Sequence, residues 1–174
     1  MRRKAREALW YIVMKLLKYN TPHFDKDKRK NSGAKWLELK GKFEGKRCFI
    51  IGSAPSVKQL DLTKLTNEYT FTCNKAFLLK DYGLKKSNFY TLSDIDFYED
   101  FKEDINSNWA EYFFVSTRIP WDIAVNKLFY FRPSGAFMRW GYFQMDMQKP
   151  LATNDTVITQ ILQIAVYLGF KEII

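Results

Sequence analysis

RCFIIGSAPS, residues 47–56, is a short apolar run that ends in a glycine and leads into a loop with two serines and a proline. The run Arg47–Ile51 has the length and the apolar character of a strand buried in a parallel sheet. Gly52 permits a tight turn directly behind it, and Pro55 suits the first turn of a helix. This stretch predicts the opening strand, turn and helix start of an α/β domain.

The same alternation continues along the chain. Further strand-like runs follow at Tyr69–Cys73, Asn88–Leu92, Tyr112–Val115 and Lys127–Phe131. Strands that alternate with helical stretches are typical of parallel sheets covered by helices. We therefore expect an α/β fold with a Rossmann-like, mainly parallel sheet flanked by helices.

The end of the sequence predicts one more helix and one more strand. Val157, Ile161, Ile164 and Leu168 recur at helical spacing, and Gly169 is a natural helix C-cap. The run 171–174 (KEII) then resembles the start of a strand, and the sequence stops two apolar residues into it. We expect from this that the C-terminal part of the domain is missing.

Composition narrows the class of protein. A chain of 174 residues that is 47% hydrophobic and 17% aromatic suits one globular domain and excludes a disordered chain. Cys48 and Cys73 lie within strand-like runs, so we interpret both as reduced core residues. The single histidine, His23, gives no support for a zinc site or a Ser-His-Asp triad.

The basic charge is confined to the first quarter of the chain. Residues 1–47 hold 15 of the 28 Lys and Arg and 5 of the 19 Asp and Glu, a net +10, which leaves −1 for the rest. We divide the chain into a basic amphipathic helix (1–20), a polar linker (21–45) and a nearly neutral domain (46–174). Trp36 and Leu39 of the linker could dock onto the domain.

The N-terminal helix has two interpretations. An apolar helical face lies among Arg and Lys residues and is formed by Leu9, Ile12, Val13 and Leu16. This pattern is typical of helices that lie on anionic membrane surfaces without crossing them. The apolar part is too short to cross a bilayer, and no signal cleavage site follows it. We expect a cytoplasmic protein that lies peripherally on the inner membrane. The alternative is a helix packed against its own domain or a partner. The apolar face and the neutral domain argue against nucleic-acid binding.

The loop after the first strand is the first candidate binding site. In open α/β sheets ligands gather at the carboxyl ends of the strands, where backbone N–H groups are exposed. The candidate residues there are Gly52, Ser53, Ala54 and Ser56. The loop matches neither the Walker A pattern nor G-x-G-x-x-G. An ordinary strand-to-helix turn remains the alternative.

The run GKRCFIIGSAPSVKQLDLTKLTNEYTFTCNKAFLL, residues 45–79, is similar to the opening of a known family. It resembles the archaeal 6-hydroxymethylpterin diphosphokinase (MptE-like) proteins and the motility-associated factor (Maf) proteins, whose opening contains GNGPSL. Bacterial CMP-sialyltransferases begin in a similar way and also carry a Cys-Asn dipeptide. The closing run 154–173 resembles the helix before the next strand of the family. The resemblance covers 45–174, with Ser53-Ala54 in place of the family's Asn-Gly.

The resemblance implies roles for residues at the ends of three further elements. Asn74 would contact the ribose or base of a nucleotide and converge with Ser53 on one crevice; alternatively, it stabilises a turn. Asp94 would hold Mg²⁺ beside phosphates, or else only cap a helix. Three residues before the last helix would lie near the nucleotide phosphate or act only as caps: Thr153, Asn154 and Thr156.

The implied activity is that of a nucleotide-dependent transferase. We expect a glycosyltransferase that uses a nucleotide-activated sugar, of the CMP or CDP type, and a small-molecule or glycan acceptor in surface glycan synthesis. One alternative is a Mg²⁺-dependent diphosphokinase that uses ATP. A non-catalytic nucleotide-binding module is a second alternative, because the family's segment after the last strand, which carries reactive residues, is missing from this sequence. The truncated chain could accordingly be inactive.

Overall fold

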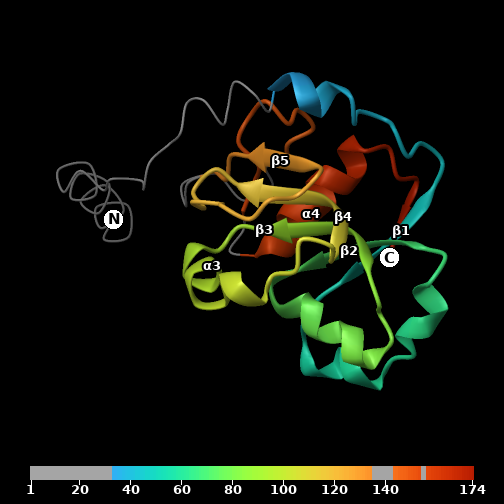
Figure 1. The fold of residues 1–174 in the computed structure, drawn as a ribbon. Coiled ribbons are helices and arrows are strands. Elements are labelled where there is room, and N and C mark those ends of the chain that lie inside the picture. The colour runs from blue at the N-terminus through green and yellow to red at the C-terminus, as the bar shows by residue number, and fades with distance from the viewer. Residues whose placement is uncertain (1–32, 135–142, 154–155) are drawn as a thin grey trace, which may run out of the picture.

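The computed structural model describes residues 33–134, 143–153 and 156–174 (Figure 1). The N-terminal helix expected over residues 1–20 lies outside these ranges, as does the linker up to residue 32. Within the described residues, no helix combines the length and the hydrophobicity that a bilayer crossing needs.

The described chain is built around one sheet of six parallel strands. The strands are β1 (Arg47–Ile51), β2 (Tyr69–Cys73), β3 (Ser87–Leu92), β4 (Ala110–Ser116), β5 (Leu128–Phe131) and β6 (Glu172–Ile173). They lie in the order β5-β4-β3-β2-β1-β6, so the order of addition reverses at β1, which has β2 on one side and β6 on the other. The prediction of a Rossmann-like parallel sheet is therefore confirmed.

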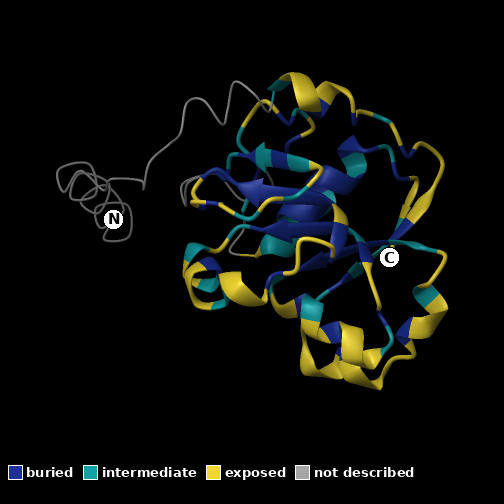
Figure 2. Cartoon of the chain, in the orientation of Figure 1, coloured by how far each residue is buried: buried dark blue, intermediate teal, exposed yellow. Residues whose placement is uncertain are grey.

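Most helices between the strands are 3₁₀ helices, which are wound more tightly than α-helices. In the described part of the chain the connections contain four of them: η1 (Pro55–Gln59), η2 (Leu62–Leu65), η3 (Asn74–Tyr82) and η4 (Lys102–Asp104). They also contain two α-helices, α3 (Ile95–Phe101) and α4 (Val157–Tyr167). The segments between β1 and β3 are largely exposed on their outer side, whereas the strands are buried (Figure 2).

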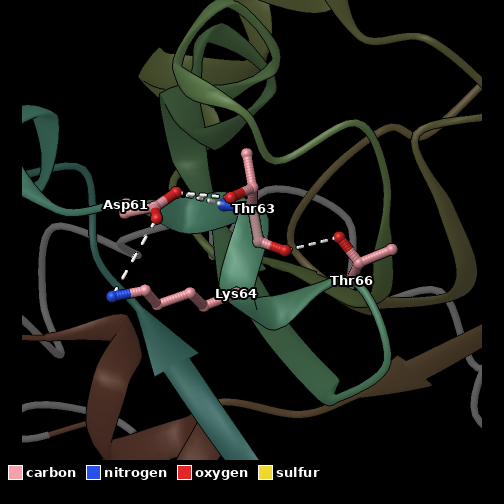
Figure 3. A network of polar contacts seen from close by, with 4 residues as sticks. All are labelled: Asp61, Thr63, Lys64 and Thr66. Atoms are coloured by element: carbon pink, nitrogen blue, oxygen red, sulfur yellow. Dashed lines mark hydrogen bonds and ion pairs between the residues drawn. The ribbon is translucent and has the colours of Figure 1, made fainter.

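Local side-chain bonds stabilise one of the 3₁₀ helices, η2. Asp61 caps η2, because its Oδ1 accepts hydrogen bonds from the backbone N–H and the hydroxyl of Thr63 (Figure 3). Lys64 Nζ lies 4.0 Å from Asp61 Oδ2, and the Thr66 hydroxyl donates to Thr63 O at 2.6 Å. These exposed contacts fix the turn that leads from η1 into β2.

Each face of the sheet has its own hydrophobic core, so the fold has three layers. One face carries side chains such as Phe71, Phe89 and Phe114 and packs against α4. The other face packs against the 3₁₀ helices and α3, with Tyr90, Phe113 and other residues of the strands. Alternate residues along each strand serve the two cores, as expected for a sheet that is covered on both sides.

Residues 33–45 belong to the first core, in which Trp36 is 1% exposed and stacks on Phe114 at 5.2 Å between ring centroids. Trp36 Nε1 donates to Tyr130 O, and the Tyr167 hydroxyl donates to Trp36 O. The expectation that Trp36 and Leu39 dock onto the domain is confirmed. This part of the expected linker is built into the domain, so the packed unit begins before residue 46.

The predicted helix cap at Gly169 is also confirmed. Gly169 has φ +90°, a conformation that glycine adopts without strain. A Cβ at this position would lie 2.9 Å from Gly41 Cα, so the docked segment also requires a glycine here. The turn thus joins α4, the segment 33–45 and β6.

Candidate functional site

A polar cavity of about 390 Å³ lies at the carboxyl ends of the strands. Because all six strands are parallel, their carboxyl ends and the loops behind them share one edge of the sheet. The cavity is lined from the ends of β2, β3, β4 and β5 and from the first turn of α4: Asn74, Ser93, Asp94, Arg118, Ser134, Thr153, Thr156, Val157 and Gln160.

The first turn of α4 faces this cavity. Thr156 is the N-cap, and its hydroxyl accepts a hydrogen bond from the N–H of Ile158 at 3.3 Å. Of the N-cap candidates before this helix, the structure thus selects Thr156. The N-terminus of an 11-residue α-helix exposes N–H groups and carries a partial positive charge. Thr153 also lines the cavity, and Asn154 lies outside the described residues.

Asn74 is held at the cavity by an unusual backbone conformation. With φ +49° it is the one non-glycine residue with a positive φ among the described residues, and asparagine tolerates this left-handed region better than most side chains. The buried Tyr90 hydroxyl donates to Asn74 O at 2.9 Å and fixes the peptide in place. The carboxamide is thereby presented to the cavity, where its Oδ1 is buried without a hydrogen-bond partner.

Two further uncharged side chains of the cavity contain a buried atom without a partner. These atoms are Ser134 Oγ and Gln160 Oε1, on residues that are 4% and 2% exposed. Thr91 Oγ1, within β3, also lacks a partner. Buried polar atoms are nearly always hydrogen-bonded in proteins, and each one left unpaired costs about 1–3 kcal/mol. Three such atoms around one cavity indicate a place where a polar ligand completes the hydrogen bonding.

The charged residues of the cavity are Arg118 and Asp94. Arg118 follows β4, is exposed, and its guanidinium pairs with no carboxylate in the described part of the chain. Asp94 caps α3, because its Oδ1 accepts from Phe97 N–H at 3.2 Å. A free guanidinium beside a helix N-terminus suits an anion such as a phosphate.

The helix-cap alternative for Asp94 is confirmed, whereas its role as a Mg²⁺ ligand stays a prediction. In the ranges that the structure covers, no three His, Cys, Asp or Glu side chains gather in a way that could hold a metal ion. Mg²⁺ in phosphate sites often needs one or two carboxylates besides the phosphates. Asp94 would be that single carboxylate, with one oxygen already engaged by the helix N-terminus.

The loop after β1 lines a different hollow. Gly52, Ala54 and Ser56 border an apolar hollow of about 690 Å³ beside β1, with Leu60, Ile174 and other mainly apolar neighbours. Ser53 is exposed and lines neither hollow, so it shares neither of them with Asn74. The loop enters η1 at Pro55 and passes over the face of β1 that carries Ile51, away from α4.

Sequence reasoning missed the apolar Val157 and four polar residues of the cavity: Ser93, Arg118, Ser134 and Gln160. The sequence pattern could have indicated one of the polar residues. Gln160 lies three residues after Val157 and four before Ile164, so it falls on the apolar face of α4 where a polar side chain needs a partner. The other three follow strands in loops, where polar residues are common.

The two thiols have no part in this site. Both cysteines are free and buried, which confirms the interpretation as reduced core residues. Burial raises the pKa of Cys48 to about 12 and that of Cys73 to about 11. Neither thiol is therefore ionised at neutral pH, and neither is an activated nucleophile.

Comparisons with known proteins add little to what the structure itself shows. No protein-family model and no curated protein matches the chain. Among solved structures, it is similar to the MAf glycosyltransferase from Magnetospirillum magneticum AMB-1, with 15% sequence identity and a TM-score of 0.46. The similarity covers 87% of this chain and 27% of that one. A likeness of this size carries no further argument about this chain.

Proposed function

We propose that the polar cavity binds a nucleotide and that the chain is a nucleotide-dependent transferase, specifically a glycosyltransferase with a pyrimidine-nucleotide sugar donor. The observation that carries this proposal is the meeting of Arg118, the first turn of α4 and three unpaired polar side chains in one cavity. A nucleotide needs both an anion site and an uncharged polar site. The cavity volume is within the range of small-molecule sites.

The phosphate would lie between Arg118 and the N-terminus of α4. A guanidinium and helical N–H groups are the usual protein partners of phosphate oxygens. In glycosyl transfer, an acceptor hydroxyl bonds to the anomeric carbon and its proton passes to solvent. The bond from that carbon to the phosphate oxygen breaks, and the nucleotide leaves with the electron pair. Arg118 and α4 would stabilise the negative charge that develops on this phosphate.

The ribose or base would contact Asn74. Its carboxamide can donate and accept hydrogen bonds, and its Oδ1 has no partner within the protein. The sequence resemblance of the Asn74 region to CMP-sialyltransferases supports a pyrimidine nucleotide. The apolar hollow is bordered by Gly52, Ala54 and Ser56, so we do not include these three residues among the nucleotide contacts.

Binding of the full chain to CMP, UDP and ATP, each with and without Mg²⁺, tests this proposal by isothermal titration calorimetry. We expect CMP or a CMP-sugar to bind more tightly than ATP. Tight Mg²⁺-dependent binding of ATP with none of pyrimidine nucleotides would instead support the diphosphokinase, with Asp94 as the metal ligand. Donor binding without transfer to any acceptor would support the non-catalytic module.

We also propose that residues 1–20 hold the chain on an anionic membrane surface, where a glycan acceptor would be available. The support is the basic, one-sided apolar pattern of this segment. Co-sedimentation with anionic and neutral vesicles, with and without residues 1–20, measures this directly. Equal binding to both vesicle types, or binding that survives the deletion, would contradict it.

A further inference from the structure

The two most buried residues that line the polar cavity, Gln160 and Ser134, are uncharged. Gln160 lies in the first turn of α4, and Ser134 follows β5. Ser134 N–H donates to Leu151 O at 2.7 Å, and Leu151 N–H donates to Arg132 O at 2.8 Å. Ser134 is thus fixed by backbone bonds on a segment that pairs with Leu151, while its own hydroxyl has no partner.

We propose that Gln160 and Ser134 select the ligand by its hydroxyl groups, so that this end of the cavity takes a moiety with neighbouring hydroxyls. This inference rests on the proposed function and adds to it the chemistry of the part of the ligand that is not phosphate. The source of the hydroxyls is either the ribose of the nucleotide or the sugar that it carries.

The unpaired atoms require donors. Gln160 Oε1 and Asn74 Oδ1, as oriented in the structure, are acceptors, and a deprotonated phosphate oxygen has no proton to donate to them. A hydroxyl group donates and accepts, and it therefore satisfies a carboxamide in either orientation as well as the Ser134 hydroxyl. Two neighbouring hydroxyls on a ring would serve Gln160 and Ser134 at once.

Because Gln160 and Ser134 are held in place by the fold, we expect the site to discriminate strongly between ligands with and without these hydroxyls. A buried site that is built to hydrogen-bond a hydroxyl rejects an analogue without it, because the polar groups of the protein are then left unpaired in the complex. Arg118 and α4 would bind the phosphate of both compounds equally. Selectivity should therefore depend on Gln160 and Ser134 and not on the anion site.

The experiment compares phosphate compounds with and without ring hydroxyls, by calorimetry on the full chain. CMP against 2′,3′-dideoxy-CMP reports the ribose, and glucose 1-phosphate against inorganic phosphate reports a sugar. In the wild type we expect a preference of about tenfold or more in at least one pair. In Gln160→Met and in Ser134→Ala this preference should fall below about threefold, while binding of inorganic phosphate stays unchanged.

Thr159→Val is the matched control, since it removes a hydroxyl from the same helix at a position that does not line the cavity. It should retain the preference. The free Gln160→Met protein should melt at the wild-type temperature or above it, because the substitution removes a buried atom that has no partner. A merely structural glutamine would instead give a lower melting temperature and an unchanged preference.

The outcomes separate the two proposals. If the wild type binds none of the phosphorylated compounds, the proposed function is wrong. If it binds them but the hydroxyl preference is absent, or persists in both Gln160→Met and Ser134→Ala, the inference is overturned and the proposed function stands. The pair whose preference is lost identifies the source of the hydroxyls.

Discussion

Two glutamines one turn apart on α4 belong to regions of opposite character. Gln163 is fully buried and makes four hydrogen bonds: its Oε1 accepts from the N–H groups of Gln144 and Ala152, and its Nε2 donates to Ala152 O and Thr159 O. Gln160 is buried to nearly the same degree, but its Oε1 has no partner. The hydrogen bonding around Gln163 is therefore complete in the free protein, whereas that around Gln160 is not.

Hydrogen bonding separates the role of Gln163 from that of Gln160. Gln163 ties the loop at Ala152 to α4 and so fixes one wall of the cavity. Gln160 Oε1 makes no hydrogen bond within the described protein, and a buried polar atom without a partner destabilises the fold. Burial is nearly the same in both cases, and the residue type is identical. We infer that Gln163 serves the fold, and we propose that Gln160 serves a ligand.

The largest expected effect is on stability, in Gln163→Met. This change leaves the N–H groups of Gln144 and Ala152 without their acceptor in the interior, and each unpaired group costs about 1–3 kcal/mol. We expect a loss of about 2–5 kcal/mol in the free energy of unfolding and a fall of roughly 10 °C in Tm. Urea and thermal unfolding measure it. A loss as large in Gln160→Met would show that both glutamines serve the fold.

The next effect is on binding, in Arg118→Met. Hydrogen bonds to charged groups contribute about 1.5–3 kcal/mol, so phosphate-bearing ligands should bind about 10- to 100-fold more weakly. The Tm should not change, because the guanidinium is exposed. Arg47→Met is the matched control at the rim of the apolar hollow, where Arg47 pairs with Glu68. Equal loss of binding in both variants would show that the anion does not occupy the polar cavity.

A smaller effect on binding is expected at Asn74, and the choice of substitution separates ligand from backbone. Both Asn74→Gly and Asn74→Ala remove the carboxamide and should weaken nucleotide binding about tenfold. Asn74→Ala should in addition lose about 1 kcal/mol of stability, since alanine is strained at φ +49° and glycine is not. Calorimetric titration and thermal unfolding of the two variants give both numbers. Unchanged binding in Asn74→Gly would remove Asn74 from the site.

The smallest effect is expected for Ser53→Asn, which restores the residue usual in the resembling family. Ser53 is exposed and lines neither hollow, so stability should change by less than about 0.5 kcal/mol. Nucleotide affinity should stay within about threefold of the wild type. Binding that tightens by tenfold would show that the β1 loop reaches the polar cavity in the complex.

Local sequence was enough to predict most of the elements. Two strands were predicted with their observed bounds, Arg47–Ile51 and Tyr69–Cys73, because buried parallel strands are nearly continuous apolar runs between turn residues. The helix before Gly169 was predicted from its apolar spacing, and its cap at Thr156 was among the candidates. The 3₁₀ character of the connections was not predicted, since short helices leave no periodic pattern.

The strands, α4, the parallel sheet and the buried cysteines could be predicted from residue patterns along the chain, because these features depend on neighbours in sequence. The set of polar residues that share a cavity became evident from the folded structure alone. Asn74 and Ser134, which follow β2 and β5, meet Gln160 of α4 there, and Ser53 lies outside. Hydrogen-bond satisfaction depends on neighbours in space and not in sequence. Those neighbours are fixed by the order of strands in the sheet and by the path of α4 across it.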